Sequence, residues 1–308
     1  MPSIACFGAV NLDRTARCLG ELVLRSSNPV AVRQAAGGVA RNVASNLGRL
    51  GQHVGLASVV GADAGGEELI RALEADGIDT SGTMRRDDEA TASYTAVLDR
   101  DGELLIGLAD MAIYDGLAPE SLRASDAPAQ EDAWFVDANL PDACIDRLTA
   151  IASGHTLLTA STVSTPKAIR LAPYLARLDV LFANRAEAAV LSGVNIQTDD
   201  DALKAADWLR DAGIGTVFIT LGPRGAVAAN DQARIALPAI PGAARDVVGA
   251  GDAFAAGALT ALLEKKSLRD ALISGLATAS ITVEVDGPTD PHLSPARVAD
   301  RAQHKLTA

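Results

Sequence analysis

The sequence predicts an α/β fold in which a mostly parallel β-sheet is covered by helices on both faces, giving a three-layer α/β/α sandwich. Two observations predict it: short apolar strands alternate with amphipathic helices along most of the chain, and two hairpin-like segments interrupt that alternation. With 308 residues, 48% of them hydrophobic, the chain is long enough to bury a large core. We expect a single domain over residues 1–308, in which the interrupting segments form a small β-sheet lid.

The strands of the main sheet are predicted from apolar runs. Residues 4–10 form a continuous apolar run, which is typical of a strand buried on both faces. Further strands are expected at 53–60, 134–137, 156–159, 180–183 and 216–220. The intervening helical patterns cover 39–50, 67–76 and 202–212, and a glycine that can cap the helix follows each of the first two.

The lid is predicted from two segments, at about 14–35 and 91–113. Residues 93–98 and 103–106 flank Asp101-Gly102, a pair typical of hairpin turns, and strand-like runs occupy 22–24 and 30–32. The alternative interpretation is an ordinary surface hairpin. Because an exposed strand edge can pair with a second copy, we expect a homodimer formed through the lid strands.

Composition argues against several classes of partner. The net charge of −12 and the pI near 4.8 oppose binding to nucleic acid or to an anionic membrane surface. No apolar run is long enough to span a bilayer, and the first residues lack the pattern of a signal peptide. The three cysteines are odd in number and scattered, so we expect a reducing, cytoplasmic setting without disulfides.

The most informative segment is Asp246-Val247-Val248-Gly249-Ala250-Gly251-Asp252, which precedes an alanine-rich helical run. A small-residue loop that opens a helix directs backbone N–H groups at one spot and forms an anion site. Asp252 lies in the first turn, where its carboxylate can accept a proton beside the bound anion and where the helix dipole is expected to lower its pKa. An anion site with a base beside it suggests phosphoryl transfer to an alcohol. The alternative is a simple helix start.

Polar residues near the N-terminus can hold the hydroxyls of an acceptor. Asn11 and Asp13 follow the first predicted strand, and an amide and a carboxylate two residues apart can bind adjacent hydroxyls. Gly37 and Gly38 allow a ligand to approach the backbone, and Asn42 lies one turn into the next helix. Each pattern also occurs in ordinary polar turns.

The nucleotide side is predicted from two strand ends. Asn184 and Glu187 form either a capping box or a polar pair that orders water on a nucleotide-bound Mg²⁺. Thr220 and Gly222 close a later strand and could line a nucleotide cleft. A Walker A pattern is absent, as is a Gly-x-Gly-x-x-Gly after the first strand.

The order of these motifs resembles the PfkB, or ribokinase-like, carbohydrate kinase family over essentially the whole chain. The motifs are Gly8-x-x-Asn11-x-Asp13, Gly37-Gly38-x-x-x-Asn42, Val60-Gly61-x-Asp63, Asn184-x-x-Glu187 and Asp246-x-x-Gly249-Ala250-Gly251-Asp252. Each is common alone, but the five stand in the family's order and spacing. The resemblance implies a ribokinase-like fold, ATP as phosphate donor and dependence on Mg²⁺.

The resemblance also assigns roles to individual residues. Asp252 is similar to the family's catalytic base, and Gly249, Ala250 and Gly251 to its anion hole. The expected acceptor-binding residues are Asn11, Asp13, Gly37, Gly38, Asn42 and Asn139. The expected nucleotide-binding residues are Asn184, Thr220, Gly222, Gly249 and Gly251, with Glu187 acting on Mg²⁺ through water. Asp246 matches a residue of a monovalent-cation loop, so K⁺ is a further expected ligand, although the family often has Thr close after this Asp and Val247-Val248 follow here.

The acceptor is predicted from a narrower resemblance. Ribokinases usually carry Gly-Gly-Lys-Gly-Ala-Asn, whereas this chain has Val39, Ala40 and Arg41 in the middle of that motif. This variant, together with Asp137-x-Asn139, is similar to the pseudouridine kinase branch, which implies phosphorylation of the 5′-hydroxyl of pseudouridine to give pseudouridine 5′-phosphate. The alternatives are a kinase for another ribonucleoside, ribose or a keto-sugar, and a non-catalytic nucleoside- or sugar-binding regulatory protein.

Overall fold

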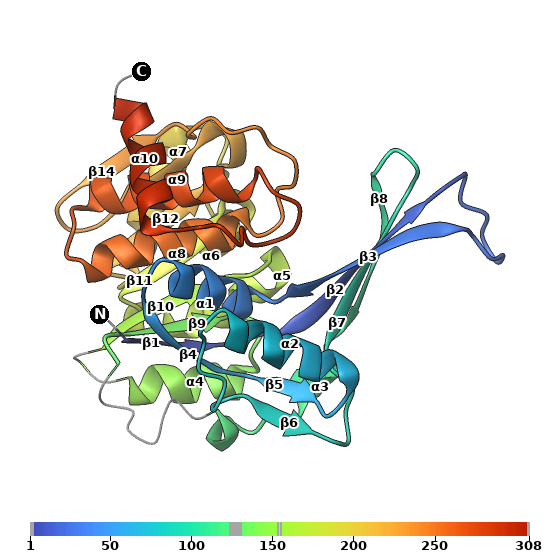
Figure 1. The fold of residues 1–308 in the computed structure, drawn as a ribbon. Helices are drawn as coiled ribbons and strands as arrows, with labels where there is room; N and C mark the ends of the chain where they lie inside the picture. The colour runs from blue at the N-terminus through green and yellow to red at the C-terminus, as the bar shows by residue number, and fades with distance from the viewer. Residues whose placement is uncertain (1–2, 123–130, 153, 155, 307–308) are drawn as a thin grey trace.

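The computed structural model describes residues 3–122, 131–152, 154 and 156–306 (Figure 1). Its main sheet has eight strands in the order β14-β13-β12-β11-β10-β9-β1-β4. The strands are β1 (Ser3–Phe7), β4 (His53–Ala57), β9 (Ala133–Asp137), β10 (Leu157–Ser161), β11 (Val180–Asn184), β12 (Thr216–Thr220), β13 (Ala226–Ala229) and β14 (Arg234–Leu237). Neighbouring strands are parallel except for the pairs β12–β13 and β13–β14, which are antiparallel. The predicted α/β fold with a mostly parallel sheet is confirmed.

Helices cover both faces of this sheet. One face carries α1 (Val39–Arg49), α2 (Ala64–Ala75), α8 (Ala250–Leu263), α9 (Leu268–Thr282) and α10 (Pro295–Leu306). The other carries α3 (Ala112–Asp115), α4 (Asp142–Ile151), α5 (Thr165–Ala168), α6 (Arg185–Ser192), α7 (Asp199–Asp211) and the 3₁₀ segments η1 (Pro119–Ser121) and η2 (Ile169–Arg177). A third 3₁₀ turn, η3 (Gly222–Arg224), follows β12. None of the helices in the described residues is long and apolar enough to cross a membrane.

Side chains of the central strands alternate between the two cores. Ala133 and Phe135 of β9 point into one core, whereas Trp134 and Val136 point into the other, as a period of two requires. The ring of Phe254 in α8 packs edge-on against Phe218, with centroids 5.9 Å apart, and against Phe182, at 6.5 Å. These contacts fix the first turns of α8 against the middle of β11 and β12.

A second sheet extends away from the main body (Figure 1). It has the order β3-β2-β7-β8, formed by β2 (Asn11–Cys18), β3 (Val30–Gly37), β7 (Ser93–Leu98) and β8 (Leu104–Asp110), and we call it the lid. The prediction of a strand at 22–24 was wrong. The Asn28 side chain accepts a hydrogen bond from the Val23 N–H (2.7 Å) and donates one to the Val23 carbonyl (2.9 Å), so this backbone belongs to a loop.

Two strand boundaries also differ from the prediction. The run 53–60 is divided between β4 and β5 (Val59–Gly61), which leaves the main sheet and pairs with β6 (Met84–Arg86). The first strand ends at Phe7, because the chain turns at Gly8 (φ +153°), where a Cβ atom would collide with the Asp137 carboxyl. Asn11 and Asp13 therefore lie on lid strand β2 and not at the end of β1.

Candidate active site

All of the predicted nucleotide residues except Gly222 and Gly249, together with the predicted base, line one cavity of about 120 Å³ between α8 and the carboxyl ends of β10, β11 and β12. Asn184, Glu187, Thr220, Gly251 and Asp252 all contribute to its wall. In open parallel sheets, ligands bind outside the carboxyl ends of the strands, so the position fits a ligand site. Gly222, which begins η3, is not among the residues that line this cavity.

Asp252 stands at the centre of the site. It lies in the first turn of α8, and its Oδ2 accepts a hydrogen bond from Asn42 Nδ2 (2.8 Å) in α1, the helix packed against α8. Burial raises the pKa of Asp252 to about 7, the bond from Asn42 opposes that rise, and the charges of Asp137, Asp13 and Glu187 add to it. The expectation that the helix dipole lowers this pKa was wrong, because desolvation outweighs it.

Residues 246–252 lead into α8 and form its first residues. We call this segment the 246–252 turn, and its backbone is held tightly. Gly249 has φ +76°, and a Cβ atom there would collide with the Pro288 backbone, so the position requires glycine. A Cβ atom at Gly251 would meet no atom within 4 Å, which leaves this part of the backbone open towards the cavity. Asp246 Oδ1 accepts the Val248 N–H (3.0 Å), and its Oδ2 accepts the Gly287 N–H (3.1 Å).

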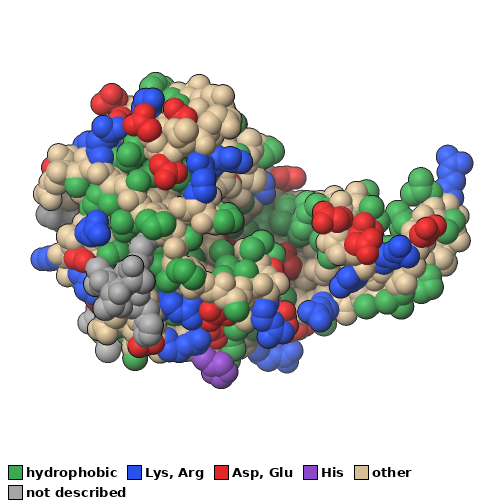
Figure 2. All heavy atoms as spheres, turned by 90° about the horizontal axis from the view of Figure 1, so that it is seen from above, with side chains coloured by type: hydrophobic (Ala, Val, Ile, Leu, Met, Phe, Trp, Pro, Cys, Tyr) green, Lys and Arg blue, Asp and Glu red, His purple; other side chains and the backbone are tan. Residues whose placement is uncertain are grey.

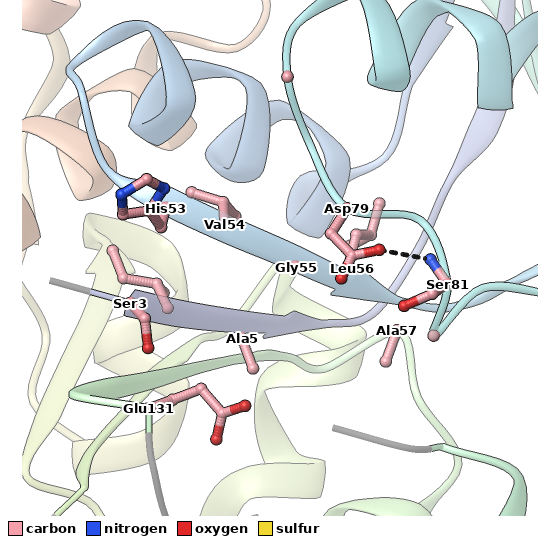
Figure 3. Close-up of a pocket in the computed structure, with 13 residues that line it drawn as sticks. Ser3, Ala5, His53, Val54, Gly55, Leu56, Ala57, Asp79, Ser81 and Glu131 are labelled. Atoms are coloured by element: carbon pink, nitrogen blue, oxygen red, sulfur yellow. Dashed lines mark hydrogen bonds between the residues drawn. The ribbon is translucent and has the colours of Figure 1, made fainter. Parts of the chain in front are cut away.

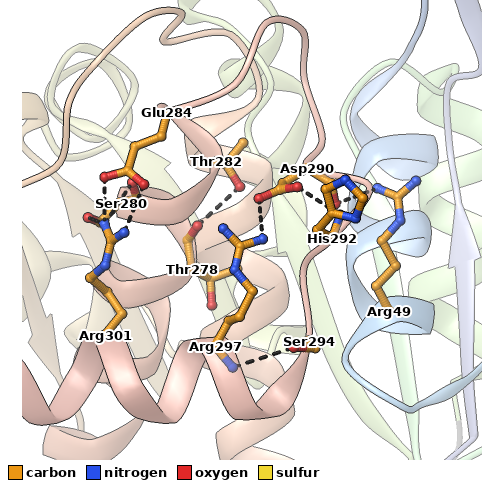
Figure 4. A network of polar contacts seen from close by, with 10 residues as sticks. All are labelled: Arg49, Thr278, Ser280, Thr282, Glu284, Asp290, His292, Ser294, Arg297 and Arg301. Carbon is orange, nitrogen blue, oxygen red and sulfur yellow. Dashed lines mark hydrogen bonds and ion pairs between the residues drawn. The ribbon is translucent and has the colours of Figure 1, made fainter.

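A polar network braces the loop that contacts this turn (Figure 4). Asp290 is buried and accepts hydrogen bonds from Arg297 of α10 (2.6 Å) and from the His292 N–H (2.7 Å). Arg49, at the end of α1, donates to the Asp290 carbonyl (3.2 Å) and also forms a two-pronged ion pair with Asp76 (2.8 Å). The network ties α1 and α10 to the loop on which Gly249 rests.

The predicted acceptor residues meet at the base of the lid. Asn11 Nδ2 donates to Asp13 Oδ1 (2.6 Å), and burial raises the pKa of Asp13. A Cβ atom at Gly37 would collide with the Asp13 carboxyl, and one at Gly38 with the Ala9 carbonyl. The charge of Asp13 acts on Asp252, so the lid residues and the end of α8 face the same region.

Asp137 is a site residue that sequence reasoning used only as part of a resemblance. Its fully buried carboxylate accepts hydrogen bonds from the backbone N–H groups of Ala9 (2.9 Å), Ala40 (2.9 Å) and Asn139 (2.8 Å). Burial raises its pKa, and these bonds oppose the rise. Asp137 thereby joins the turn before β2 to the start of α1. An aspartate at the end of an apolar strand is the one sequence signal that could have found it.

Asn139 lies beside Asp137 but is itself engaged. Its side-chain oxygen accepts a hydrogen bond from Lys167 Nζ (2.5 Å) of α5. Burial lowers the pKa of Lys167, while the charge of Asp137 raises it. The structure therefore places a half-buried ammonium group next to the predicted acceptor residue.

Asn184 and Glu187 form the capping box that their spacing predicts, and their role towards Mg²⁺ stays a prediction. They form a capping box, in which Asn184 Oδ1 accepts the Glu187 N–H (3.0 Å) and Glu187 Oε2 accepts the Asn184 N–H (2.9 Å). They also line the cavity, and Thr162 donates to Glu187 Oε2 (2.5 Å). The helix cap thus holds an oxygen-rich pair at the edge of the cavity.

A larger cavity, of about 280 Å³, lies along β1 and β4 (Figure 3). Ser3, His53, Asp79, Ser81 and Glu131 contribute to its wall, and none of the predicted site residues does. The larger of these two cavities is therefore not the one that holds the predicted site residues.

Comparison with known proteins identifies the class. Residues 1–295 match the model of the pfkB family carbohydrate kinases, so the chain belongs to this family. It is similar to a solved carbohydrate kinase from Agrobacterium tumefaciens, with 35% identity, a TM-score of 0.86 and coverage of 98% of this chain and 97% of that one.

Two curated relatives carry more specific names. The ribokinase of Haemophilus influenzae is 32% identical over 82% of each chain. The pseudouridine kinase of Escherichia coli is 27% identical over 96% of this chain and 95% of its own. Together these matches define a kinase for a sugar or a nucleoside.

Proposed function

We propose that the protein transfers the γ-phosphoryl group of ATP to the 5′-hydroxyl of pseudouridine, with Asp252 as the general base. The observation that carries the proposal is the position of Asp252: it borders the cavity of the nucleotide residues and is bonded to Asn42 on the acceptor side. A carboxylate between the two sides can receive the proton of a hydroxyl that attacks a phosphate.

The donor side fits a nucleoside triphosphate with its magnesium ion. ATP as donor is supported by membership of a kinase family. Carboxylate and amide oxygens suit Mg²⁺, which usually keeps several waters, and Glu187 Oε1 accepts only the Asn184 side chain among the hydrogen bonds of the described residues. Glu187 and Asn184 would hold the ion through water, and the ion would neutralise phosphate charge. Backbone N–H groups of Gly249 to Gly251 would stabilise the charge that develops during transfer, and that of Ala250 would give up its bond to the Val247 carbonyl (3.3 Å) to do so.

Asp246 is the proposed ligand of K⁺. Its two oxygens accept one backbone hydrogen bond each, which leaves acceptor capacity on both. A cation there would lie behind the 246–252 turn, where it would act on the shape of the turn and not on the substrate.

The acceptor side would fix the ribose ring. Asp13 and Asn11 would bind its hydroxyls, and Gly37 and Gly38 would let it approach the backbone of the lid base. Positioning of this kind can contribute as much as ~7–11 kcal/mol in well-oriented reactions. A lid closed over the ring would exclude water and limit hydrolysis of ATP.

Asp252 would then accept the 5′-hydroxyl proton. A base is most effective when its pKa lies near the working pH, and the pKa of Asp252 is raised to about 7. The burial that raises this pKa therefore makes the carboxylate a stronger base than a solvated aspartate.

The choice of pseudouridine is supported by the Val39-Ala40-Arg41 motif and by the likeness to the E. coli pseudouridine kinase over almost the full length of both chains. A second candidate is ribose, because the H. influenzae ribokinase has the higher identity, over a shorter stretch. A non-catalytic binder is the candidate of another class, but it would have no use for Asp252.

We further propose that two copies associate through the lid. Every residue of β8 is exposed, and Leu104, Ile106 and Leu108 place apolar side chains on the surface of the lid (Figure 2). Light scattering is expected to give a dimer, and Ile106→Lys to shift it towards monomer. A monomeric wild-type protein at assay concentration would contradict this assembly.

One assay tests the proposed reaction. ADP release, coupled to a reporter enzyme, is measured with pseudouridine, uridine, adenosine, cytidine, ribose and fructose as acceptors. We expect the highest kcat/KM with pseudouridine. A higher value with ribose would favour a ribokinase, and no acceptor-dependent ADP release would favour the binder.

A further inference from the structure

Arg41 is a buried cation that the proposed reaction does not yet use. It lies in the first turn of α1 with 6% of its surface exposed. Its Nη1 donates to the Ala36 carbonyl (3.2 Å) and to Asn42 Oδ1 (3.1 Å), while its Nε has no hydrogen-bond partner. Among the ion pairs of the described residues, none involves Arg41. Burying a guanidinium without a paired carboxylate lowers the stability of the fold, so we expect this arginine to serve a function.

Two contacts fix which way the side-chain amide of Asn42 faces, one with Asp252 and one with Arg41. Arginine only donates hydrogen bonds, so Asn42 has to turn its oxygen towards Arg41. Its NH₂ group then faces the other way, towards Asp252 Oδ2, at 2.8 Å. If the amide were reversed, two donors would meet on one side and two acceptors on the other.

We propose that Arg41 is a positioning residue for phosphoryl transfer: by fixing the amide of Asn42, it holds Asp252 Oδ2 in place and leaves Oδ1 to receive the proton of the acceptor hydroxyl. The proposal rests on the proposed function, because it takes Asp252 as the base. Arg41 touches neither reactant and acts through Asn42.

The charges around the site give Arg41 a second effect. Asp252 is surrounded by Asp13 of β2, Asp137 of β9 and Glu187 of α6, each of which raises its pKa. Arg41 interacts with Asp76, Arg49, Asp13 and Asp252, and although burial lowers its own pKa to about 10, it stays charged at neutral pH. Arg41 is thus a cation within a cluster of acids, and its removal is expected to raise the pKa of Asp252 further.

Three variants remove or restore the donor and the charge of Arg41. Arg41→Met removes both the donor and the charge, Arg41→Gln keeps a polar group that no longer dictates the amide orientation, and Arg41→Lys restores the charge. Arg301→Met is the matched control, because Arg301 of α10 is also a largely buried arginine but contacts Ser280 and Glu284. Thermal unfolding establishes that each variant is folded.

The first readout does not depend on turnover. The carboxyl carbon of Asp252 is titrated by NMR in the ligand-free protein, with its signal assigned by its loss in Asp252→Asn. We expect Arg41→Met and Arg41→Gln to raise the titration midpoint by about one unit, as loss of a nearby opposite charge does. Arg41→Lys and the control Arg301→Met are expected to leave it close to wild type.

The second readout is kinetic. With the best acceptor of the panel, Arg41→Met is expected to lower kcat about tenfold, which is less than the roughly 10²–10⁴-fold that loss of the general base itself would cost, with a smaller change in acceptor KM. In Arg41→Met, the acidic limb of the pH profile of kcat/KM is expected to move to higher pH. In Arg41→Lys, it is expected to lie at the wild-type pH. A folded Arg41→Met with wild-type kcat and midpoint would overturn the proposal. If Arg41→Met does not fold, a wild-type kcat and a wild-type midpoint in Arg41→Gln would overturn the proposal.

The two proposals fail in different ways. Full activity in Asp252→Asn would remove the base and with it the proposed function, whatever Arg41 does. A wild-type kcat and a wild-type titration of Asp252 in the folded Arg41 variants, together with an inactive Asp252→Asn, would overturn the role of Arg41 alone.

Discussion

The 246–252 turn and the lid are held in opposite ways. Gly249 of the turn rests against Pro288, Asp246 is bonded to the next loop, and Phe254 is packed among aromatic rings. The lid has no such surroundings, since β8 is exposed along its whole length and β3 along most of it. The difference teaches that Asp252, the proposed base, is fixed by the core. The lid, which is proposed to close over the acceptor, is held mainly by the pairing of its own strands.

Buried hydrogen bonds anchor the base of the lid in the body. The Tyr114 hydroxyl, buried in α3, accepts the Val10 N–H (2.7 Å) and donates to the Val10 carbonyl (3.0 Å), just before β2. Asp63 accepts hydrogen bonds from the Thr91 N–H (2.8 Å) and hydroxyl (2.7 Å), just before β7. The Val60-Gly61-x-Asp63 motif therefore holds the entry of a lid strand, which gives it a structural role.

The largest effect is expected at the turn. Asp252→Asn removes the proposed base, and we expect kcat to fall by about 10²–10⁴-fold. ATP binding, measured by calorimetry, is expected to persist because the backbone of the turn is unchanged. Near-normal turnover would show that Asp252 is not the base.

The next effect is expected at the lid base. Asp13→Ala removes a carboxylate that would bind acceptor hydroxyls, and we expect the acceptor KM to rise about 10- to 100-fold, equivalent to the loss of one hydrogen bond to a charged group. Steady-state kinetics at saturating ATP measures it, with Asp101→Ala in the exposed hairpin turn as the control. An acceptor KM equal to that of the control would place Asp13 outside the acceptor site.

A smaller effect is expected at the anchor of the lid. Tyr114→Phe leaves the buried Val10 N–H without its partner, which should lower the free energy of unfolding by about 1–3 kcal/mol. Hydrogen exchange is expected to speed up in β2, which begins beside Val10. Tyr94→Phe in β7 is the control, and equal exchange in the two variants would argue that Tyr114 does not anchor the lid.

The last effect concerns stability and pH. The pKa of Asp252 is raised in the folded state from 3.8 to about 7, so the folded protein binds the extra proton and loses stability as pH rises between about 4 and 7. Asp252→Asn does not show this loss of stability, because asparagine does not ionise. The free energy of unfolding of Asp252→Asn minus that of wild type, measured in urea at pH 5 and pH 8, is therefore expected to be larger at pH 8. A difference that stays constant with pH would mean that Asp252 ionises freely in the folded state.

The sequence was most informative where structure depends on neighbours in the chain. The alternating apolar runs located the parallel strands, and the Asn184–Glu187 spacing matched a cap that forms locally. It was less informative where distant residues decide. The first strand ends at Gly8 because of Asp137, which lies 129 positions further along the chain. The run at 22–24 is apolar enough for a strand, but a single asparagine side chain bonds its backbone into a loop.

The electrostatics of the site could not be predicted for the same reason. The helix position of Asp252 suggested a low pKa, but burial, which comes from the packing around the end of α8, reverses the sign. The contact between Asp252 and Asn42 joins residues 210 positions apart. The amide orientation of Asn42 depends in turn on Arg41, which sequence reasoning used only as a mark of resemblance.

A crystal structure with a non-hydrolysable ATP analogue and the acceptor tests the central claim most directly. The account predicts that the terminal phosphate lies on the backbone N–H groups of Gly249 to Gly251, and that the acceptor hydroxyl lies within hydrogen-bond distance of Asp252. Terminal phosphates bound elsewhere, or an acceptor hydroxyl turned away from Asp252, would contradict it.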